Sequence, residues 1–148
     1  MEIDTLRQEL ADLFEYERWA NRKWDSTVEA LGDKAEKVRE HVLKAQEIWY
    51  SRCLSEADLA PRTGSLGDSL AVMAQHWQEL IRTSDPTAYV SYQTLTGEKF
   101  VNLLEDIARH VVNHGTYHRG QLREMAAQNQ VEFPETDFIL WRRLADRG

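Results

Sequence analysis

Apolar residues recur every three or four positions along most of the chain, and this spacing constrains the fold more than any other feature. At 3.6 residues per turn, such a repeat places the apolar side chains on one face of a helix. The strict alternation that is typical of strands is scarce. The sequence therefore predicts an all-α protein. In the first segment the repeat comprises Ile3, Leu6, Leu10, Leu13, Ala20, Trp24, Val28 and Leu31.

Glycine and proline divide this pattern into five helical segments. Gly32 ends the first segment, because glycine readily adopts the left-handed conformation at that position. Pro61 and residues 63–67 follow the second segment, and Asp85-Pro86 ends the third. Residues 88–97 have weak strand character. The predicted helices cover residues 3–31, 33–59, 65–84, 98–130 and 135–145.

Four long amphipathic helices joined by short connections predict a four-helix bundle, followed here by a short C-terminal helix. The chain has 148 residues, of which 42% are hydrophobic. This length is enough to bury a core without disulfides or a structural metal, so we expect residues 1–148 to form a single domain.

Three of the five histidines, His110, His114 and His118, follow one another in steps of four. Residues four apart lie on the same side of a helix. His114 and His118 continue the apolar register of the predicted helix 98–130, so we expect both to point into the bundle. Two imidazoles on successive turns are a ready pair of ligands for a divalent metal ion.

His41 is the candidate third ligand, because it lies in the apolar register of the second predicted helix. Three inward histidines from two helices would bind zinc, nickel, iron or manganese and leave a coordination position open. The alternative is that each histidine is a core residue hydrogen-bonded to a neighbour. His110 is rotated from the apolar stripe, and is either a residue supporting the ligands, a pocket residue or an exposed one.

Other metal and catalytic motifs are absent from the sequence. A di-iron bundle needs Glu-xx-His on two helices. The zinc-protease helix needs His-Glu-xx-His, whereas residues 114–118 read His-Gly-Thr-Tyr-His. The single cysteine excludes zinc fingers and iron–sulfur clusters. The sequence contains neither a phosphate-binding glycine loop nor a Gly-x-Ser-x-Gly elbow.

Several polar residues have two interpretations each. Glu17 and Asn21 would either orient a ligand imidazole or reach solvent, the commoner state of such residues. Arg119 or Tyr117 would orient an anionic substrate, or Arg119 would brace the bundle by pairing with a carboxylate. Cys53 is expected to be a buried thiol rather than a reactive one.

The composition limits the partners and the compartment. With 18 basic and 25 acidic residues, the net charge is −7, which argues against binding the nucleic-acid backbone. The sequence contains neither an apolar run long enough to span a bilayer nor a signal peptide, so no membrane partner is expected. One cysteine fits a reducing compartment. The cytoplasm is the expected location.

Four segments of the chain resemble the DinB/YfiT-like family of metal-dependent bundle proteins, which is distinct from the translesion polymerase of similar name. The strongest resemblance lies in Asn113-His114-Gly115-Thr116-Tyr117-His118-Arg119-Gly120-Gln121-Leu122. Weaker matches are residues 16–21 (YERWAN), 41–49 (HVLKAQEIW) and 134–138 (PETDF).

The resemblance implies a four-helix bundle that binds one divalent metal ion. Its ligands would be His41 from the second helix and the pair His114 and His118. Family members often form homodimers. Characterised relatives include enzymes that move low-molecular-weight thiols, such as bacillithiol or mycothiol, onto or within small substrates, and most members have no demonstrated reaction.

We therefore expect a metal-dependent enzyme, of the thiol S-transferase or hydrolase type, that acts on a small molecule through a metal-activated thiol or water. Two alternatives stay open at this point. One is a non-enzymatic metal-binding or stress-response protein whose ion only joins two helices. The other is a metal-free helical interaction module.

Overall fold

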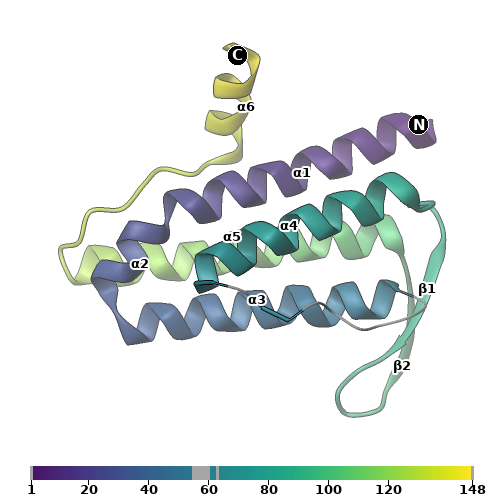
Figure 1. The fold of residues 1–148 in the computed structure, drawn as a ribbon, viewed down its shortest axis with the longest axis horizontal. Coiled ribbons are helices and arrows are strands. Elements are labelled where there is room, and N and C mark those ends of the chain that lie inside the picture. Colours follow the sequence, from purple (N-terminus) through teal and green to yellow (C-terminus); the bar gives the residue numbers. More distant parts are fainter. Residues whose placement is uncertain (1, 55–60, 63, 148) are drawn as a thin grey trace.

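The computed structural model describes residues 2–54, 61–62 and 64–147. This part of the chain is predominantly helical and contains one two-stranded sheet, which is broadly consistent with the predicted all-α class (Figure 1). The elements in chain order are α1 (Ile3–Lys23), α2 (Asp25–Leu31), α3 (Asp33–Cys53), α4 (Leu66–Thr83), β1 (Tyr89–Gln93), β2 (Lys99–Leu103), α5 (Leu104–Gln128) and α6 (Phe138–Arg147).

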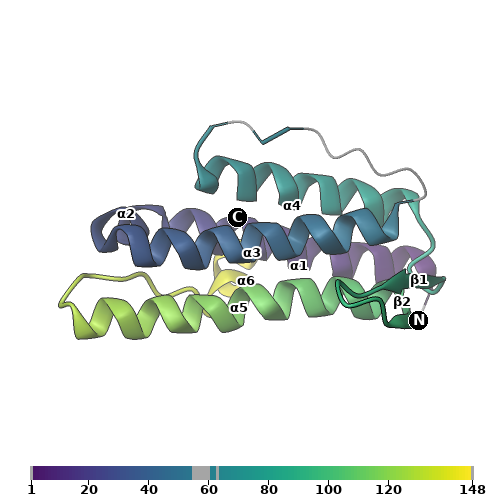
Figure 2. The ribbon, with the colours of Figure 1, turned by 90° about the horizontal axis from the view of Figure 1, so that it is seen from below.

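The four long helices α1, α3, α4 and α5 lie side by side, and α1 and α3 each pack against both α4 and α5. Figure 2 shows α3 running between α4 and α5. This arrangement is consistent with the predicted four-helix bundle. Its main core draws buried residues from all four helices and includes the stacked rings of Phe14 and Trp77, whose centroids lie 5.1 Å apart.

The first predicted helix is interrupted at Trp24, which separates α1 from α2. In an unbroken helix the Asn21 carbonyl would accept a hydrogen bond from the Asp25 amide. Here that carbonyl accepts from the Trp24 amide at 3.2 Å and from Arg39 Nη1 at 2.9 Å. Arg39 also contacts the Asp25 carboxylate, so this buried cation holds the break in place. Gly32, with φ of 82°, ends α2 as predicted.

Helices α3 and α4 differ from their predicted ranges at one end each. Helix α3 ends at Cys53, before the predicted end at residue 59, and Leu54 is already extended. Residues 55–60 lie outside the described part of the chain. Ser65 caps α4, because its Oγ accepts from the Asp68 amide at 3.1 Å while Asp68 accepts from the Ser65 amide. The helix proper therefore begins at Leu66.

A β-hairpin replaces the first turns of the predicted helix 98–130. Strand β1 lies within the segment with predicted strand character, and it pairs antiparallel with β2 so that Tyr92 is opposite Phe100. Gly97, with φ of 90°, makes the turn, a conformation that favours glycine. The prediction of helix from residue 98 was wrong, because the spacing of Phe100 and Leu103 suits a helix equally well, whereas Phe100 is exposed on the hairpin.

The C-terminal helix α6 begins at Phe138 rather than at residue 135, because the chain before it is held extended against α1. The Thr136 carbonyl accepts from Tyr16 Oη at 2.5 Å, and Thr136 Oγ1 accepts from Trp24 Nε1 at 3.1 Å. Beyond this anchor α6 projects from the side of α1 (Figure 1), and its Trp141 ring packs 5.9 Å from that of Tyr16. Among the described helices, none has the length and apolar character that crossing a membrane requires.

Candidate metal centre

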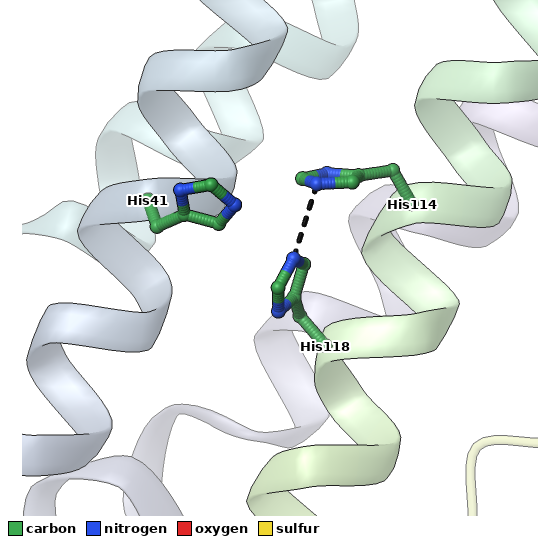
Figure 3. A group of neighbouring side chains, drawn as sticks. All are labelled: His41, His114 and His118. Carbon is green, nitrogen blue, oxygen red and sulfur yellow. Dashed lines mark hydrogen bonds between the residues drawn. The ribbon is translucent and has the colours of Figure 1, made fainter.

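Helix α5 presents His110, His114 and His118 on successive turns, and α3 places His41 opposite the last two. Figure 3 shows the side chains of His41, His114 and His118 pointing toward one another across the space between the two helices. One ring nitrogen from each of the three lies within 4.8 Å of the others. The predicted ligand set is therefore brought together.

The position of the cluster differs from the prediction, which placed all three histidines inside the bundle. His41 is exposed, and His114 and His118 are half-buried. The cluster thus lies at the solvent-accessible edge of the contact between α3 and α5.

The three imidazoles fit one divalent ion. Zinc bound to imidazole at 2.0–2.1 Å in a tetrahedral site needs ligand atoms about 3.4 Å apart. The Nε2 atoms of His114 and His118 are 3.0 Å apart, and no two candidate ligand nitrogens of the three histidines are more than 4.8 Å apart. Ring rotations that move atoms by about 1 Å reach the tetrahedral value.

Two features hold the imidazoles in the form that binds metal. Gln121 Oε1 lies 2.7 Å from His118 Nδ1, so that nitrogen carries the proton and the Nε2 lone pair faces the cluster. Burial, together with the neighbouring imidazoles, lowers the pKa of His114 to about 4. His114 is therefore neutral at pH 7, the charge state that metal binding requires. Because His118 Nε2 accepts, the contact of 3.0 Å between the two Nε2 atoms makes His114 Nε2 the donor, and a metal ion bound there would replace that proton.

His110 and Tyr117 lie beside the cluster rather than in it. The His110 ring is exposed and lies 6.0 Å from the His114 ring and 5.3 Å from that of Trp49. The Tyr117 side chain is 66% exposed, and its ring meets His118 edge-on at 5.0 Å. His110 was predicted to support the ligands, to line a pocket or to be exposed; it is exposed, and it lines the smaller of the two cavities described below.

Glu17 and Asn21 are buried, in contrast to the commoner expectation that they reach solvent. Glu17 Oε1 accepts from Arg119 Nη1 at 2.5 Å, and Glu17 Oε2 accepts from Gln46 Nε2 at 3.0 Å and from Asn21 Nδ2 at 3.2 Å. In the described part of the chain, these contacts lead to Arg119 and Gln46 and not to a histidine. Neither residue orients an imidazole directly.

Arg119 braces the helices, the second of its two predicted roles. Its buried guanidinium also donates to Asn21 Oδ1 at 2.9 Å and to Thr116 Oγ1 at 3.1 Å. Burial is the largest single effect on the pKa of Arg119 and lowers it, but Glu17 and Tyr16 together outweigh burial and raise the pKa. The ion pair between Arg119 and Glu17 joins α5 to α1, and the hydrogen bond from Gln46 joins α3 to the same Glu17 carboxylate.

Gly115 and Gln121 were not among the predicted site residues. A Cβ atom on Gly115 would lie 2.2 Å from Glu17 Oε2 and 2.7 Å from Glu17 Cδ. Glycine therefore lets the carboxylate of Glu17 approach the backbone of α5, between the two histidine ligands. Both residues stand inside the quoted histidine motif, and the step of three from His118 to Gln121 was a usable signal for contact on one helix face.

Two cavities flank α5 on opposite sides. One of about 380 Å³ lies between α1, α5 and residues 134–138. Its α5 wall includes Thr116 and Gly120, which at 100° per residue face away from His114. The other, of about 290 Å³, is lined in part by His110 and so lies on the side of the histidine cluster.

Cys53 and most of the tryptophans have structural positions. Burial raises the pKa of the Cys53 thiol to about 12, so the half-buried thiol is protonated at neutral pH. Trp24, Trp77 and Trp141 are buried, whereas Trp19 and Trp49 are half-buried against the core.

Comparison of this chain with family models, curated proteins and solved structures gives no match. Its resemblance to the DinB/YfiT-like family therefore stays a prediction from the sequence motifs, and the site stands on its own geometry.

Proposed function

We propose that the chain binds one divalent metal ion through His41, His114 and His118, with zinc or nickel preferred and iron or manganese as further candidates. The observation that carries this proposal is the convergence of three imidazole nitrogens from two helices within 4.8 Å. An all-imidazole donor set suits these borderline ions better than magnesium or calcium, which prefer oxygen ligands.

We further propose that the protein is an enzyme of the thiol S-transferase or hydrolase type that acts on a small molecule. An ion held by three protein ligands, with a position open to solvent, would lower the pKa of a bound thiol or water and supply a nucleophile near neutral pH. The exposure of His41 supports an open position, because a solely structural site is normally closed by a fourth protein ligand.

The remaining residues of the site fix its geometry. Gln121 sets the tautomer and orientation of His118. The buried contacts of Glu17 with Arg119 and Gln46 keep α5 and α3 at a constant separation, and the two sets of ligands stand on these helices. Such rigid support matters because ligand atoms must be held to a few tenths of an ångström.

This proposal agrees with the resemblance to the DinB/YfiT-like family, which implies the same fold, the same three ligands and a low-molecular-weight thiol as cosubstrate. The four packed helices support it. The homodimer that the resemblance implies is likewise a proposal.

Cobalt substitution tests the open coordination position. Cobalt(II) bound to three imidazoles and a solvent molecule absorbs in the visible range, and addition of 2-mercaptoethanol should add an intense thiolate-to-cobalt band in the near ultraviolet. A cobalt-loaded protein whose spectrum ignores thiol and pH would instead indicate a saturated structural site. The His76→Ala variant is a control, because His76 contacts Tyr50 and not the cluster.

A further inference from the structure

A continuous row of aromatic rings leads from the histidine cluster to the β-hairpin. The His110 ring lies 6.0 Å from that of His114 and 5.3 Å from that of Trp49 on α3. The Trp49 ring in turn meets Tyr92 of β1 at 5.0 Å. Three elements that are distant in the sequence thus meet beside the cluster.

A cavity of about 290 Å³ opens along this row, and its lining combines flat rings with a few polar groups. This composition is typical of pockets for small molecules. The lining residues are Trp49, Tyr92, Asn102, Asp106, Ile107 and His110.

The walls of the cavity are held in place by contacts of their own. Tyr92 Oη donates to Asn102 Oδ1 at 2.6 Å, which leaves the amide hydrogens of Asn102 available to a ligand. The Arg52 guanidinium lies over the rings of Trp49 and Tyr92, at 4.5 Å and 4.9 Å from their centroids. A pocket whose walls are fixed before binding loses less entropy when a ligand enters.

The size and position of the cavity define what it would take. A cavity of about 150 Å³ lined by apolar side chains holds benzene, so about 290 Å³ holds one ring with a substituent. His110 lines the cavity and its ring lies 6.0 Å from that of His114, so the cavity adjoins the histidine cluster on the same side of α5. A two-carbon linker places a sulfur atom about 5–6 Å from the centre of a phenyl ring.

We propose that this cavity seats a planar, aromatic ring of the substrate, and that a short linker carries the substrate's metal-binding group to the histidines. The inference rests on the proposed function and adds the substrate class to it. Trp49, Tyr92 and His110 contact the ring, and the linker leaves the cavity past His110 toward His114. These residues set specificity for aromatic over saturated rings.

The test compares 2-phenylethanethiol with 2-cyclohexylethanethiol, which share the linker and the thiol but differ in the flatness of the ring. Cobalt-loaded protein is titrated with each thiol, and binding is measured from the intensity of the thiolate-to-cobalt band. Aromatic contacts should make the phenyl compound bind about three- to tenfold more tightly. Tyr92→Ala and His110→Ala should each reduce this ratio below about twofold. Tyr89→Ala, which removes a 75%-exposed ring of the same strand outside the cavity, should keep it. Equal affinities in the unchanged protein, or a preference that survives both cavity variants, would overturn the inference.

A second measurement separates this inference from the proposed function. The indole N–H signal of Trp49 is followed by NMR in metal-free protein as 2-phenylethanol is added. A change in the Trp49 chemical shift that becomes smaller in His110→Ala supports the cavity as a ring site. This conclusion holds even if the protein binds no cobalt, since lack of cobalt binding would overturn only the metal proposal. Absence of any shift, together with normal cobalt binding, would overturn the ring site and leave the metal site intact.

Discussion

Replacing Gly115 by alanine should destabilise the protein, although alanine is the better helix former. In a helix interior this exchange ordinarily stabilises by about 1 kcal/mol. Here the new Cβ would lie 2.2–2.7 Å from the carboxylate atoms of Glu17. Glu17 is fully buried and holds hydrogen bonds from Arg119, Gln46 and Asn21, so its carboxylate can retreat only by breaking them.

The magnitude follows from what the retreat of Glu17 disrupts. Breaking a buried ion pair costs about 3–5 kcal/mol, because an uncompensated charge is left in the interior. After subtraction of the gain in helix propensity, Gly115→Ala should lower the free energy of unfolding by about 2–4 kcal/mol. Gly120→Ala is a matched control on the same helix, since a Cβ there meets nothing within 4 Å. It should raise the free energy of unfolding by about 0.5–1 kcal/mol.

Urea denaturation followed by circular dichroism measures both variants. The reasoning also predicts coupling: in a Glu17→Ala background the clash is gone, and Gly115→Ala should then stabilise the protein by about 1 kcal/mol. If Gly115→Ala is as stable as Gly120→Ala, the close packing of Glu17 on α5 is refuted.

Further predictions concern Gln121 and Cys53. Gln121→Ala removes the hydrogen-bond partner of His118 Nδ1 and should weaken zinc affinity about 10- to 100-fold, measured by competition with a chromophoric chelator. Gln128→Ala loses only a contact with Glu124 and should leave the zinc affinity unchanged. Equal zinc affinities of the two variants would contradict the role of Gln121. Iodoacetamide at pH 8 should alkylate Cys53 in the folded protein more than about a hundredfold slower than in urea, since burial raises the pKa of its thiol to about 12. The Cys53 thiol ionises at lower pH in the unfolded chain than in the folded protein. The free energy of unfolding should therefore fall as the pH rises from about 9 toward 12, by up to about 1.4 kcal/mol per pH unit. Cys53→Ala should lack this loss, and identical pH curves for the two proteins would contradict it.

The helical elements were predictable wherever periodicity and capping agreed. The predicted end at Gly32 is confirmed, because the left-handed conformation of glycine acts within one turn of the chain. The predicted start at Ser65 is one residue early, since Ser65 is the cap of the helix. The convergence of His41 with His114 and His118 was predicted from their helical register together with the family resemblance, because a helical repeat does not show which helices are neighbours.

Strand β2 and the break at Trp24 were not predictable, because each depends on a partner distant in sequence. Phe100 and Leu103 suit either a helix or a strand, and pairing with β1 decides between them. The break at Trp24 depends on Arg39, which captures a carbonyl from another helix.

The burial of Glu17 was missed for the same reason. An acidic residue is expected in solvent unless it is paired, and its partners Arg119 and Gln46 lie on two other helices. The exposure of His41 was missed because periodicity gives the face of a helix and not how deeply that face is covered.

The most direct test of the metal centre is elemental analysis of purified, untagged protein beside His41→Ala and a His114→Ala/His118→Ala double variant, with His76→Ala as a control. The three-imidazole site predicts about one first-row divalent ion per chain in the unchanged protein and in His76→Ala, and near-complete loss in the double variant. Absence of metal from the unchanged protein after incubation with zinc, nickel and manganese, or equal metal content in all variants, would contradict it.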